Sequence, residues 1–460
     1  MSTKVDGPKR PIISSRDELV AYVEAGSKPE SEWRIGTEHE KFAFTLADHA
    51  PVPYVGKSGI AALLQGFEDR FGWKAIVEEG NIIGLSCIDC PKGGAISLEP
   101  GGQVELSGAP FDTVHETEEE LRQHLAKVGE IGADLGMGFL GFGFSPKWSL
   151  EATPMMPKER YRIMMRTMPR KGKHGLDMMF RTATVQVNLD FGDEADMVRK
   201  MRVGLALQPV ATALFANSPF SDGKPNGFQS YRAEMWRDTD PDRTGLLPFA
   251  FEDGMGFERY VDYALDVPMY FVYRDGRYTD AAGASFRDFL AGRLAALPGA
   301  RPTLDDWSDH LTTLFPDVRL KRFLEMRGAD AGSLPQMLAL PALWVGLLYD
   351  KTALDEASLL VADWTAEERQ ALRDAVPRHG LATPFREGTV LDVARQMVTL
   401  AEAGLKRRAR LDASGEDERK LLAPLIETVE TGDSPAVRLL VDYHGPWDGD
   451  IDKVFDAAAL

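Results

Sequence analysis

The stretch TATVQVNLDF, residues 182–191, decides what kind of fold this chain can form. Its polar residues alternate strictly with apolar ones and are Thr182, Thr184, Gln186, Asn188 and Asp190. Because successive side chains of a β-strand point to opposite faces, this period of two predicts a strand with one polar and one apolar face. The apolar face requires a core. The polar face either meets solvent or lines a polar pocket, and alternation alone leaves both interpretations open.

Two neighbouring segments predict strands that bring acidic residues together. Residues 33–44, WRIGTEHEKFAF, alternate as a strand with Glu38 and Glu40 on one face, roughly 6.6 to 6.8 Å apart. Residues 96–107, ISLEPGGQVELS, predict a β-hairpin that turns at PGG and puts Glu99 and Glu105 on a shared face. Close carboxylates repel one another unless a proton or cation lies between them, and hard cations such as Mg²⁺ bind carboxylate oxygens. A solvated sheet edge is the alternative, and another hairpin register would change the grouping.

Basic residues gather in two further segments. Residues 157–173, PKERYRIMMRTMPRKGK, carry five arginines and lysines at mixed helical spacings between residues 160 and 171, which predicts an anion site or, alternatively, a solvated face. Residues 261–273 and 319–327 alternate like strands. The second of these, RLKRFLEMR, puts a mostly charged set on one face: Arg319, Lys321, Phe323, Glu325 and Arg327.

Composition and charge limit the classes of partner. The 460 residues include 53 Lys and Arg against 71 Asp and Glu, a net charge of −18, which disfavours nucleic acid and anionic membrane surfaces and favours small molecules. The longest apolar run, residues 334–349, contains two prolines and is shorter than about 18 residues, so it predicts a buried helix. The first ten residues, MSTKVDGPKR, show no signal or transit peptide. We expect one α+β domain over residues 1–460, sheet-rich over 1–330 and helical over 331–460.

Three short motifs do not define a site. The pair Cys87 and Cys90 forms a CxxC without the further ligands of a zinc site, and its role stays open. The sequence GMGFLG, residues 136–141, follows a predicted helix where a dinucleotide fingerprint follows a strand. VGKS at residues 55–58 lacks the upstream glycine of a P-loop. Any ATP site is therefore of another type.

Longer motifs carry a specific resemblance. The chain is similar to the plant-type glutamate–cysteine ligases, a family also found in proteobacteria, along GTEHEKFAF, SLEPGGQVELSGAP, RTATVQVNLDF, GKPNGF, DTDPDRTG and HLTTLFPDVRLKRFLEMRGAD. This resemblance implies a glutamine-synthetase-like carboxylate–amine ligase fold, an antiparallel sheet funnel for ATP, Mg²⁺ and glutamate, and ligation of glutamate to cysteine through γ-glutamyl phosphate. It also implies a cytoplasmic bacterial protein, monomeric or homodimeric. The disulfides that regulate plant members cannot form here, because HETEEELRQHL, LAALPGARPT and LPQMLALPALW contain no cysteine.

Phosphoryl transfer requires metal-binding carboxylates and phosphate-binding cations, which assigns expected roles. We expect Mg²⁺ to be held by the carboxylates of Glu38, Glu40, Glu99, Glu105 and Glu325. Arg327 is expected to stabilise the transferring phosphoryl group. The glutamate substrate is expected to contact Arg160, Arg232, Thr184, Gln186 and Asn188, with Arg181 and Arg243 in reserve. Replacing Glu325 by Ala is expected to abolish ATP turnover and leave the fold intact. Structural ion pairs are the alternative for each arginine, and the rival functions are ligation to another amine and non-catalytic binding of glutamate or nucleotide.

Overall fold

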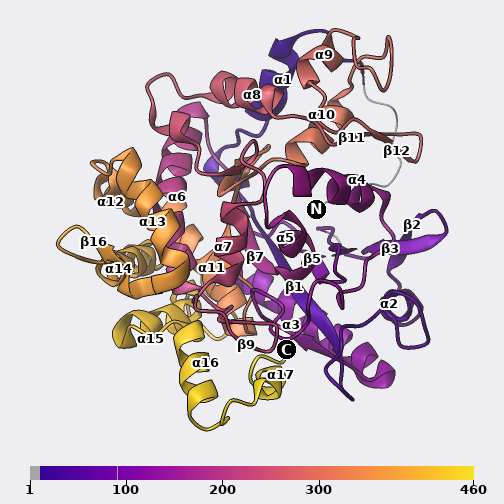
Figure 1. The fold of residues 1–460 in the computed structure, drawn as a ribbon. Helices are drawn as coiled ribbons and strands as arrows, with labels where there is room; N and C mark the ends of the chain where they lie inside the picture. The colour runs from indigo at the N-terminus through magenta and orange to yellow at the C-terminus, as the bar shows by residue number, and fades with distance from the viewer. Residues whose placement is uncertain (1–10, 91) are drawn as a thin grey trace.

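A large antiparallel sheet organises the molecule (Figure 1), whose computed structural model describes residues 11–90 and 92–460. The sheet has nine strands in the order β14-β15-β7-β1-β5-β4-β3-β2, with β6 paired to β1. Its strands are β1 (Ile35–Thr45), β2 (Lys74–Glu78), β3 (Asn81–Ser86), β4 (Ala95–Leu98), β5 (Val104–Ser107), β6 (Met137–Leu140), β7 (Thr184–Leu189), β14 (Val318–Leu320) and β15 (Leu324–Asp330). The predicted α+β class is confirmed.

Helices surround this sheet and make up most of the C-terminal part of the chain (Figure 1). They are α1 (Arg16–Glu24), α2 (Ile60–Phe71), α3 (Val114–Leu135), α4 (Glu159–Thr167), α5 (Gly175–Arg181), α6 (Glu194–Leu214), α7 (Tyr231–Arg237), α8 (Phe257–Asp266), α9 (Phe286–Leu290), α10 (Leu304–Thr312), α11 (Leu334–Leu348), α12 (Lys351–Val361), α13 (Ala366–His379), α14 (Val390–Arg408), α15 (Ala423–Thr431), α16 (Pro435–His444) and α17 (Val454–Ala457). Four small two-stranded ladders pair β8 (Phe220–Ser221) with β9 (Lys224–Pro225), β10 (Thr244–Gly245) with β13 (Phe315–Pro316), β11 (Phe271–Arg274) with β12 (Arg277–Asp280), and β16 (Pro384–Phe385) with β17 (Gly388–Thr389).

The strand predicted from TATVQVNLDF is β7, and it lies between β1 and β15. Val185, Val187 and Leu189 are fully buried in the main core, where α11 packs against the strand. Thr184 and Gln186 point to the other face and line a cavity. The alternation therefore separates a face that makes the core from a face that makes a pocket.

The predicted acidic strands have the expected register. β1 pairs with β5 so that Glu40 lies opposite Glu105, and β4 pairs with β5 so that Ser97 also lies opposite Glu105. The Glu99 amide donates to the Gln103 carbonyl at 2.9 Å, which closes the hairpin around PGG. Carboxylates from β1 and from this hairpin are thereby neighbours on one face.

Two predicted strands are wrong. Residues 261–273 form the end of α8 and then β11. Tyr260, Val261, Ala264 and Leu265 are buried at helical spacing. Over so few residues, this helical spacing of apolar side chains was mistaken for the alternation of a strand. Residues 319–327 do not form one strand but the hairpin of β14 and β15, with a turn in which the Lys321 amide donates to the Phe323 carbonyl at 3.0 Å.

The region expected to be helical, residues 331–460, contains α11 to α17, with a 3₁₀ turn at residues 418–422 before α15. The run at residues 334–349 is the buried helix α11. Among the described residues, no single helix is long and apolar enough to cross a bilayer. Taken together, α11 and α12 reach that length and hydropathy, but the two helices are bent by 89° relative to each other.

Cys87 and Cys90 form a disulfide in the loop after β3. The N-terminal MSTKVDGPKR, in which we expect no targeting segment, lies outside the described residues.

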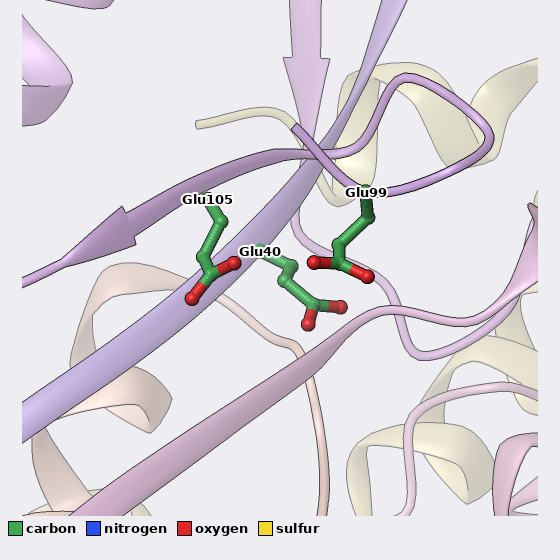
Figure 2. A group of neighbouring side chains, drawn as sticks. All are labelled: Glu40, Glu99 and Glu105. Atoms are coloured by element: carbon green, nitrogen blue, oxygen red, sulfur yellow. The ribbon is translucent and has the colours of Figure 1, made fainter. Parts of the chain in front are cut away.

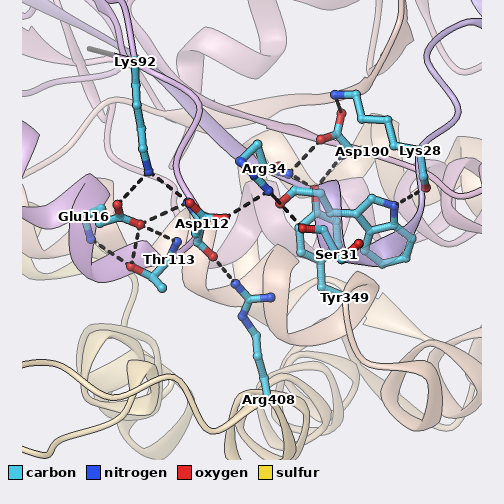
Figure 3. A network of polar contacts seen from close by, with 11 residues as sticks. Lys28, Ser31, Arg34, Lys92, Asp112, Thr113, Glu116, Asp190, Tyr349 and Arg408 are labelled. Carbon is cyan, nitrogen blue, oxygen red and sulfur yellow. Dashed lines mark hydrogen bonds and ion pairs between the residues drawn. The ribbon is translucent and has the colours of Figure 1, made fainter. Parts of the chain in front are cut away.

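A polar network fastens the segment before β1 to the helical C-terminal part (Figure 3). The Tyr349 hydroxyl at the end of α11 donates to the Arg34 carbonyl and accepts from the Asp190 amide, both at 2.6 Å. Asp190 also pairs with Lys28 at 2.8 Å. On α14, Arg408 donates to the Asp112 carbonyl at 2.5 Å. Asp190 thus belongs to this network and not to the cavity.

Candidate active site

The polar face of the sheet forms the floor of a cavity of about 610 Å³. Strands β1, β5, β7, β14 and β15 contribute the polar floor residues Glu38, Glu40, Glu105, Thr184, Gln186, Arg319 and Arg327. Helices α4, α5 and α7 contribute a wall that includes Tyr161, Met178, Met179, Arg232 and Trp236. Charged groups of both signs therefore face one space between the sheet and the helices.

Three carboxylates meet at one end of this cavity. Glu40 on β1, Glu99 at the hairpin turn and Glu105 on β5 each place one oxygen within 4.8 Å of the others (Figure 2). Burial raises the pKa of Glu40 well above its usual range, and the charges of Glu99 and Glu105 add to the rise. Burial and then the Glu105 charge raise the pKa of Glu99 to about 7. Such mutual repulsion is relieved by a bound cation.

Neighbouring groups hold these carboxylates in place. Ser97 and Ser107 donate to Glu105 at 2.8 and 2.9 Å, and the Thr184 amide donates to Glu40 at 3.0 Å. The oxygen-only donor set fits a hard divalent cation such as Mg²⁺, which prefers carboxylate ligands and water. The described residues contain no other group of three metal-binding side chains of this compactness.

A cluster of cations lies at the β14–β15 side of the cavity. Glu325 is completely buried and accepts from Arg319 at 2.6 and 2.9 Å and from Arg327 at 2.9 Å, with Lys321 at 3.6 Å. Burial alone would raise the pKa of Glu325, but the charges of these three cations outweigh it and hold that pKa well below its usual range. Arg327 also donates to Gln186 at 2.6 Å. One buried carboxylate thus orients two arginines that line the cavity.

Arg232 enters the cavity from α7. It is 3% exposed and donates to the Arg327 carbonyl at 2.9 Å, so the helix is tied to β15. The Asp330 carboxylate at the end of β15 accepts from Ser218 at 2.6 Å and from Ser230, the residue before α7, at 2.8 Å. These bonds fix where α7 begins and therefore where Arg232 points.

Comparison with known proteins identifies the family of this chain. Residues 34–457 match the model of Glutamate-cysteine ligase family 2. The chain belongs to this family. It is 56% identical over 96% of its length to the chloroplastic glutamate–cysteine ligase of Medicago truncatula, covering 84% of that protein, and 54% identical over 96% to that of Arabidopsis thaliana, covering 82%.

Solved structures of low sequence identity share the fold. A glutamate–cysteine ligase from Francisella tularensis in complex with AMP matches with a TM-score of 0.55 at 12% identity, over 93% of this chain and 87% of that one. A bifunctional glutathione synthetase from Pasteurella multocida matches with a TM-score of 0.50 at 10% identity, over 96% of this chain and 53% of that one. The α+β fold of this chain is therefore shared with these two proteins.

Three arginines named from the sequence do not line the cavity in this family member. Arg181 pairs with Asp177 and Asp222 at 2.9 and 2.8 Å. Arg243 pairs with Asp240 at 2.7 Å and donates to two carbonyls. Arg160 lies over the Phe271 ring, 5.1 Å from its centroid. For Arg181 and Arg243 the geometry favours the alternative interpretation as structural ion pairs.

Two more expected residues have other partners. The Asn188 amide donates to Glu38 at 3.0 Å, so Asn188 orients a lining carboxylate and does not itself line the cavity. Glu325 lies outside the carboxylate trio, and its oxygens are taken up by arginines. A metal ligand at Glu325 would require these ion pairs to open, so the ligand-free geometry gives that prediction no support.

Arg319 and Trp236 also line the cavity, although neither is among the residues predicted for it from the sequence. For Arg319 a signal was present, because it shares the charged face of RLKRFLEMR with Glu325. For Trp236 the useful pattern was its position four residues after Arg232, one helical turn along the same face of α7. Trp236 is brought to the cavity by the packing of α7 on the sheet, whereas Arg319 lies on β14 and is held by Glu325.

Proposed function

We propose that this protein is an ATP-dependent glutamate–cysteine ligase, which catalyses the first step of glutathione biosynthesis. The observation that carries the proposal is the meeting of a buried carboxylate trio with an arginine cluster in one cavity, in a chain that belongs to Glutamate-cysteine ligase family 2. Opposite charges at the two ends suit a metal–triphosphate complex, whose cation and phosphates carry the complementary charges.

The reaction needs activation because a free carboxylate has a poor leaving group. A γ-carboxylate oxygen of glutamate attacks the γ-phosphorus of ATP, the bond to the ADP oxygen breaks, and γ-glutamyl phosphate forms. The neutral amine of cysteine then attacks the acyl carbon, phosphate leaves with the bonding electrons, and the nitrogen loses a proton. Both steps depend on positioning and charge neutralisation more than on a covalent protein group.

The residues of the cavity take the following roles in this proposal. Glu40, Glu99 and Glu105 hold Mg²⁺, with Glu38 beside them. When bound, the metal neutralises phosphate charge. Arg327 and Arg319 stabilise the transferring phosphoryl group, and Glu325 keeps both arginines in position. Arg232, Thr184 and Gln186 contact the glutamate substrate, whose carboxylate suits a buried guanidinium.

The test is phosphate release by the full chain with ATP and Mg²⁺, omitting each amino acid in turn. We expect release only when glutamate and cysteine are both present. Release with glutamate and 2-aminobutyrate at a higher kcat/KM than with cysteine would assign another amine acceptor. Binding of nucleotide without any release would make the protein a non-catalytic binder.

We further infer a cytoplasmic protein of bacterial origin, monomeric or homodimeric. Support comes from the absence of cysteine in the segments that carry the regulatory disulfides of plant members. The net charge of −18 disfavours binding to nucleic acid or membrane surfaces. Cell fractionation and light scattering of the purified chain test compartment and mass.

A further inference from the structure

The carboxylate of Glu99 depends on a different element of the fold from the other two members of the trio. Donors from the sheet itself bind the carboxylates of Glu40 and Glu105. Glu99 lies instead where the hairpin turns (Figure 2). Among the described residues, the only donor within hydrogen-bond distance of its carboxylate is the hydroxyl of Tyr161, which comes from α4. Tyr161 has no role in the proposal so far.

The backbone that carries Glu99 is fixed from both sides of the turn. Gln103, which is 1% exposed, donates from its side-chain amide to the Thr182 carbonyl at 2.8 Å, so the turn is joined to the segment before β7. On the other side the Met156 amide donates to the Pro100 carbonyl at 2.9 Å. The freedom that remains to Glu99 therefore lies mainly in its side-chain torsions.

The Tyr161 hydroxyl has one hydrogen and two acceptors within reach. Tyr161 is 1% exposed, and its oxygen lies 2.6 Å from the Leu98 carbonyl oxygen and 3.4 Å from Oε1 of Glu99. The Leu98 carbonyl has a second donor, because the buried ammonium group of Lys158 donates to it at 2.8 Å. The Tyr161 hydrogen can therefore turn to Glu99 and leave the Leu98 carbonyl still paired.

We propose that Tyr161 is a positioning residue of the metal site, whose hydroxyl donates to Glu99 and turns that carboxylate toward Glu40 and Glu105. The assignment rests on the proposed function, which places Mg²⁺ at this trio. A carboxylate has two oxygens, so a hydrogen bond to one leaves the other for the cation. Hydrogen bonds of this kind orient metal-binding carboxylates and restrict their rotation before the metal arrives.

A merely structural role for the Tyr161 hydroxyl leads to a different expectation. If the hydroxyl served only to hold α4 against Leu98, its removal would lower stability and leave metal affinity unchanged. In Tyr161→Phe, however, Lys158 still donates to the Leu98 carbonyl, so no buried acceptor on the backbone loses its last partner. We therefore expect the melting temperature of Tyr161→Phe to stay within about 2 °C of wild type.

The experiment measures binding of Mn²⁺, a cation that also prefers carboxylate ligands, to the full chain without nucleotide by electron paramagnetic resonance. We expect Tyr161→Phe to raise the Kd for Mn²⁺ about tenfold or more, because Glu99 is no longer oriented. In phosphate release, the Mg²⁺ concentration for half-maximal rate should rise similarly, whereas the KM values for glutamate and cysteine at saturating Mg²⁺ should stay within about twofold.

The matched control is Tyr54→Phe, which removes the same kind of bond outside the cavity. The Tyr54 hydroxyl donates to the Ile82 carbonyl at 3.0 Å, and its loss should leave the Kd for Mn²⁺ unchanged. A double-mutant cycle tests whether Tyr161 acts through Glu99. In a Glu99→Gln background, adding Tyr161→Phe should change the Kd for Mn²⁺ by less than about twofold.

Three results would overturn the assignment: an unchanged Kd for Mn²⁺ in Tyr161→Phe, a full further loss of affinity in the Glu99→Gln background, or an increase confined to the KM of glutamate or cysteine. The fate of the proposed function is separate, because Mn²⁺ binding needs no turnover. A wild-type protein that shows the expected Mn²⁺ pattern and releases no phosphate would refute the ligase activity and leave the role of Tyr161 intact.

Discussion

Glu40 and Glu99 illustrate how a site can work against the stability of its own fold. Burial and mutual repulsion raise the pKa values of Glu40 and Glu99, to about 7 for Glu99. A carboxyl whose pKa is higher in the folded state than its ordinary 4.5 favours folding less as the pH rises. For Glu99 this loss develops between about pH 4.5 and pH 7, so above pH 7 the metal-free protein retains a repulsion that a bound cation would relieve.

Replacing Glu99 by Gln should therefore stabilise the metal-free protein and abolish its activity. Because the neutral amide removes the repulsion, we expect the free energy of unfolding at pH 8 to rise by about 1–3 kcal/mol, with little difference from wild type near pH 4.5. Thermal and urea unfolding at several pH values measure this, and phosphate release measures activity. Glu119→Gln, on the exposed side of α3, is the control and should change neither. A destabilised Glu99→Gln would mean that the carboxylate contributes to the fold in its charged form.

The hairpin of β14 and β15 shows how one element combines stability and function. Glu325 is surrounded by Arg319, Lys321 and Arg327, all in this hairpin, and it is fully buried. Removing one partner of a buried ion pair costs far more than removing a surface pair, because the remaining charges lose their compensation. The expectation that Glu325→Ala leaves the fold intact is therefore revised.

We predict that Glu325→Ala lowers the free energy of unfolding by about 3–5 kcal/mol, because it leaves buried cations uncompensated. Denaturant unfolding followed by circular dichroism measures the change. Glu130→Ala is the control; it removes an exposed partner of Arg70 at 3.4 Å and should cost less than about 1 kcal/mol. Glu325→Gln, which keeps two polar atoms, should stay folded and lose phosphate release because Arg327 is no longer held. Near-wild-type stability of Glu325→Ala would show that the cations find other partners.

Strands and turns with local sequence signals were predictable, whereas contacts between distant elements were not. β7, β1 and the PGG hairpin were predictable because alternation and turn residues are local signals. The turn at residues 321–323 contains no Gly, Pro or Asn, so RLKRFLEMR reads as one strand. Whether Glu325 meets a metal or arginines depends on tertiary neighbours. Periodicity predicts on which face of the strand Glu325 lies, but only the packed structure shows which residues contact that face.

At the scale of the whole molecule, the sheet-rich and helical parts share one core. α11 packs against both β7 and α14, and its residues belong to the same buried cluster as those of the sheet. The network of Figure 3 adds polar contacts between the segment before β1, the end of β7 and the helices that follow β15. An active site built on the sheet therefore depends on helices from the distant end of the chain.

Our last prediction is that residues 11–460 unfold as one cooperative unit and that Tyr349 couples the two parts. Tyr349→Phe removes the hydroxyl that bonds the Asp190 amide and the Arg34 carbonyl, so two largely buried backbone groups lose their partner. We expect a loss of about 1–3 kcal/mol in the free energy of unfolding, with the transitions by circular dichroism and by tryptophan fluorescence shifted together. Tyr22→Phe on α1 serves as the control. Two separated transitions, in wild type or in Tyr349→Phe, would show instead that the sheet and the C-terminal helices are independent folding units, and the single-domain interpretation would fail.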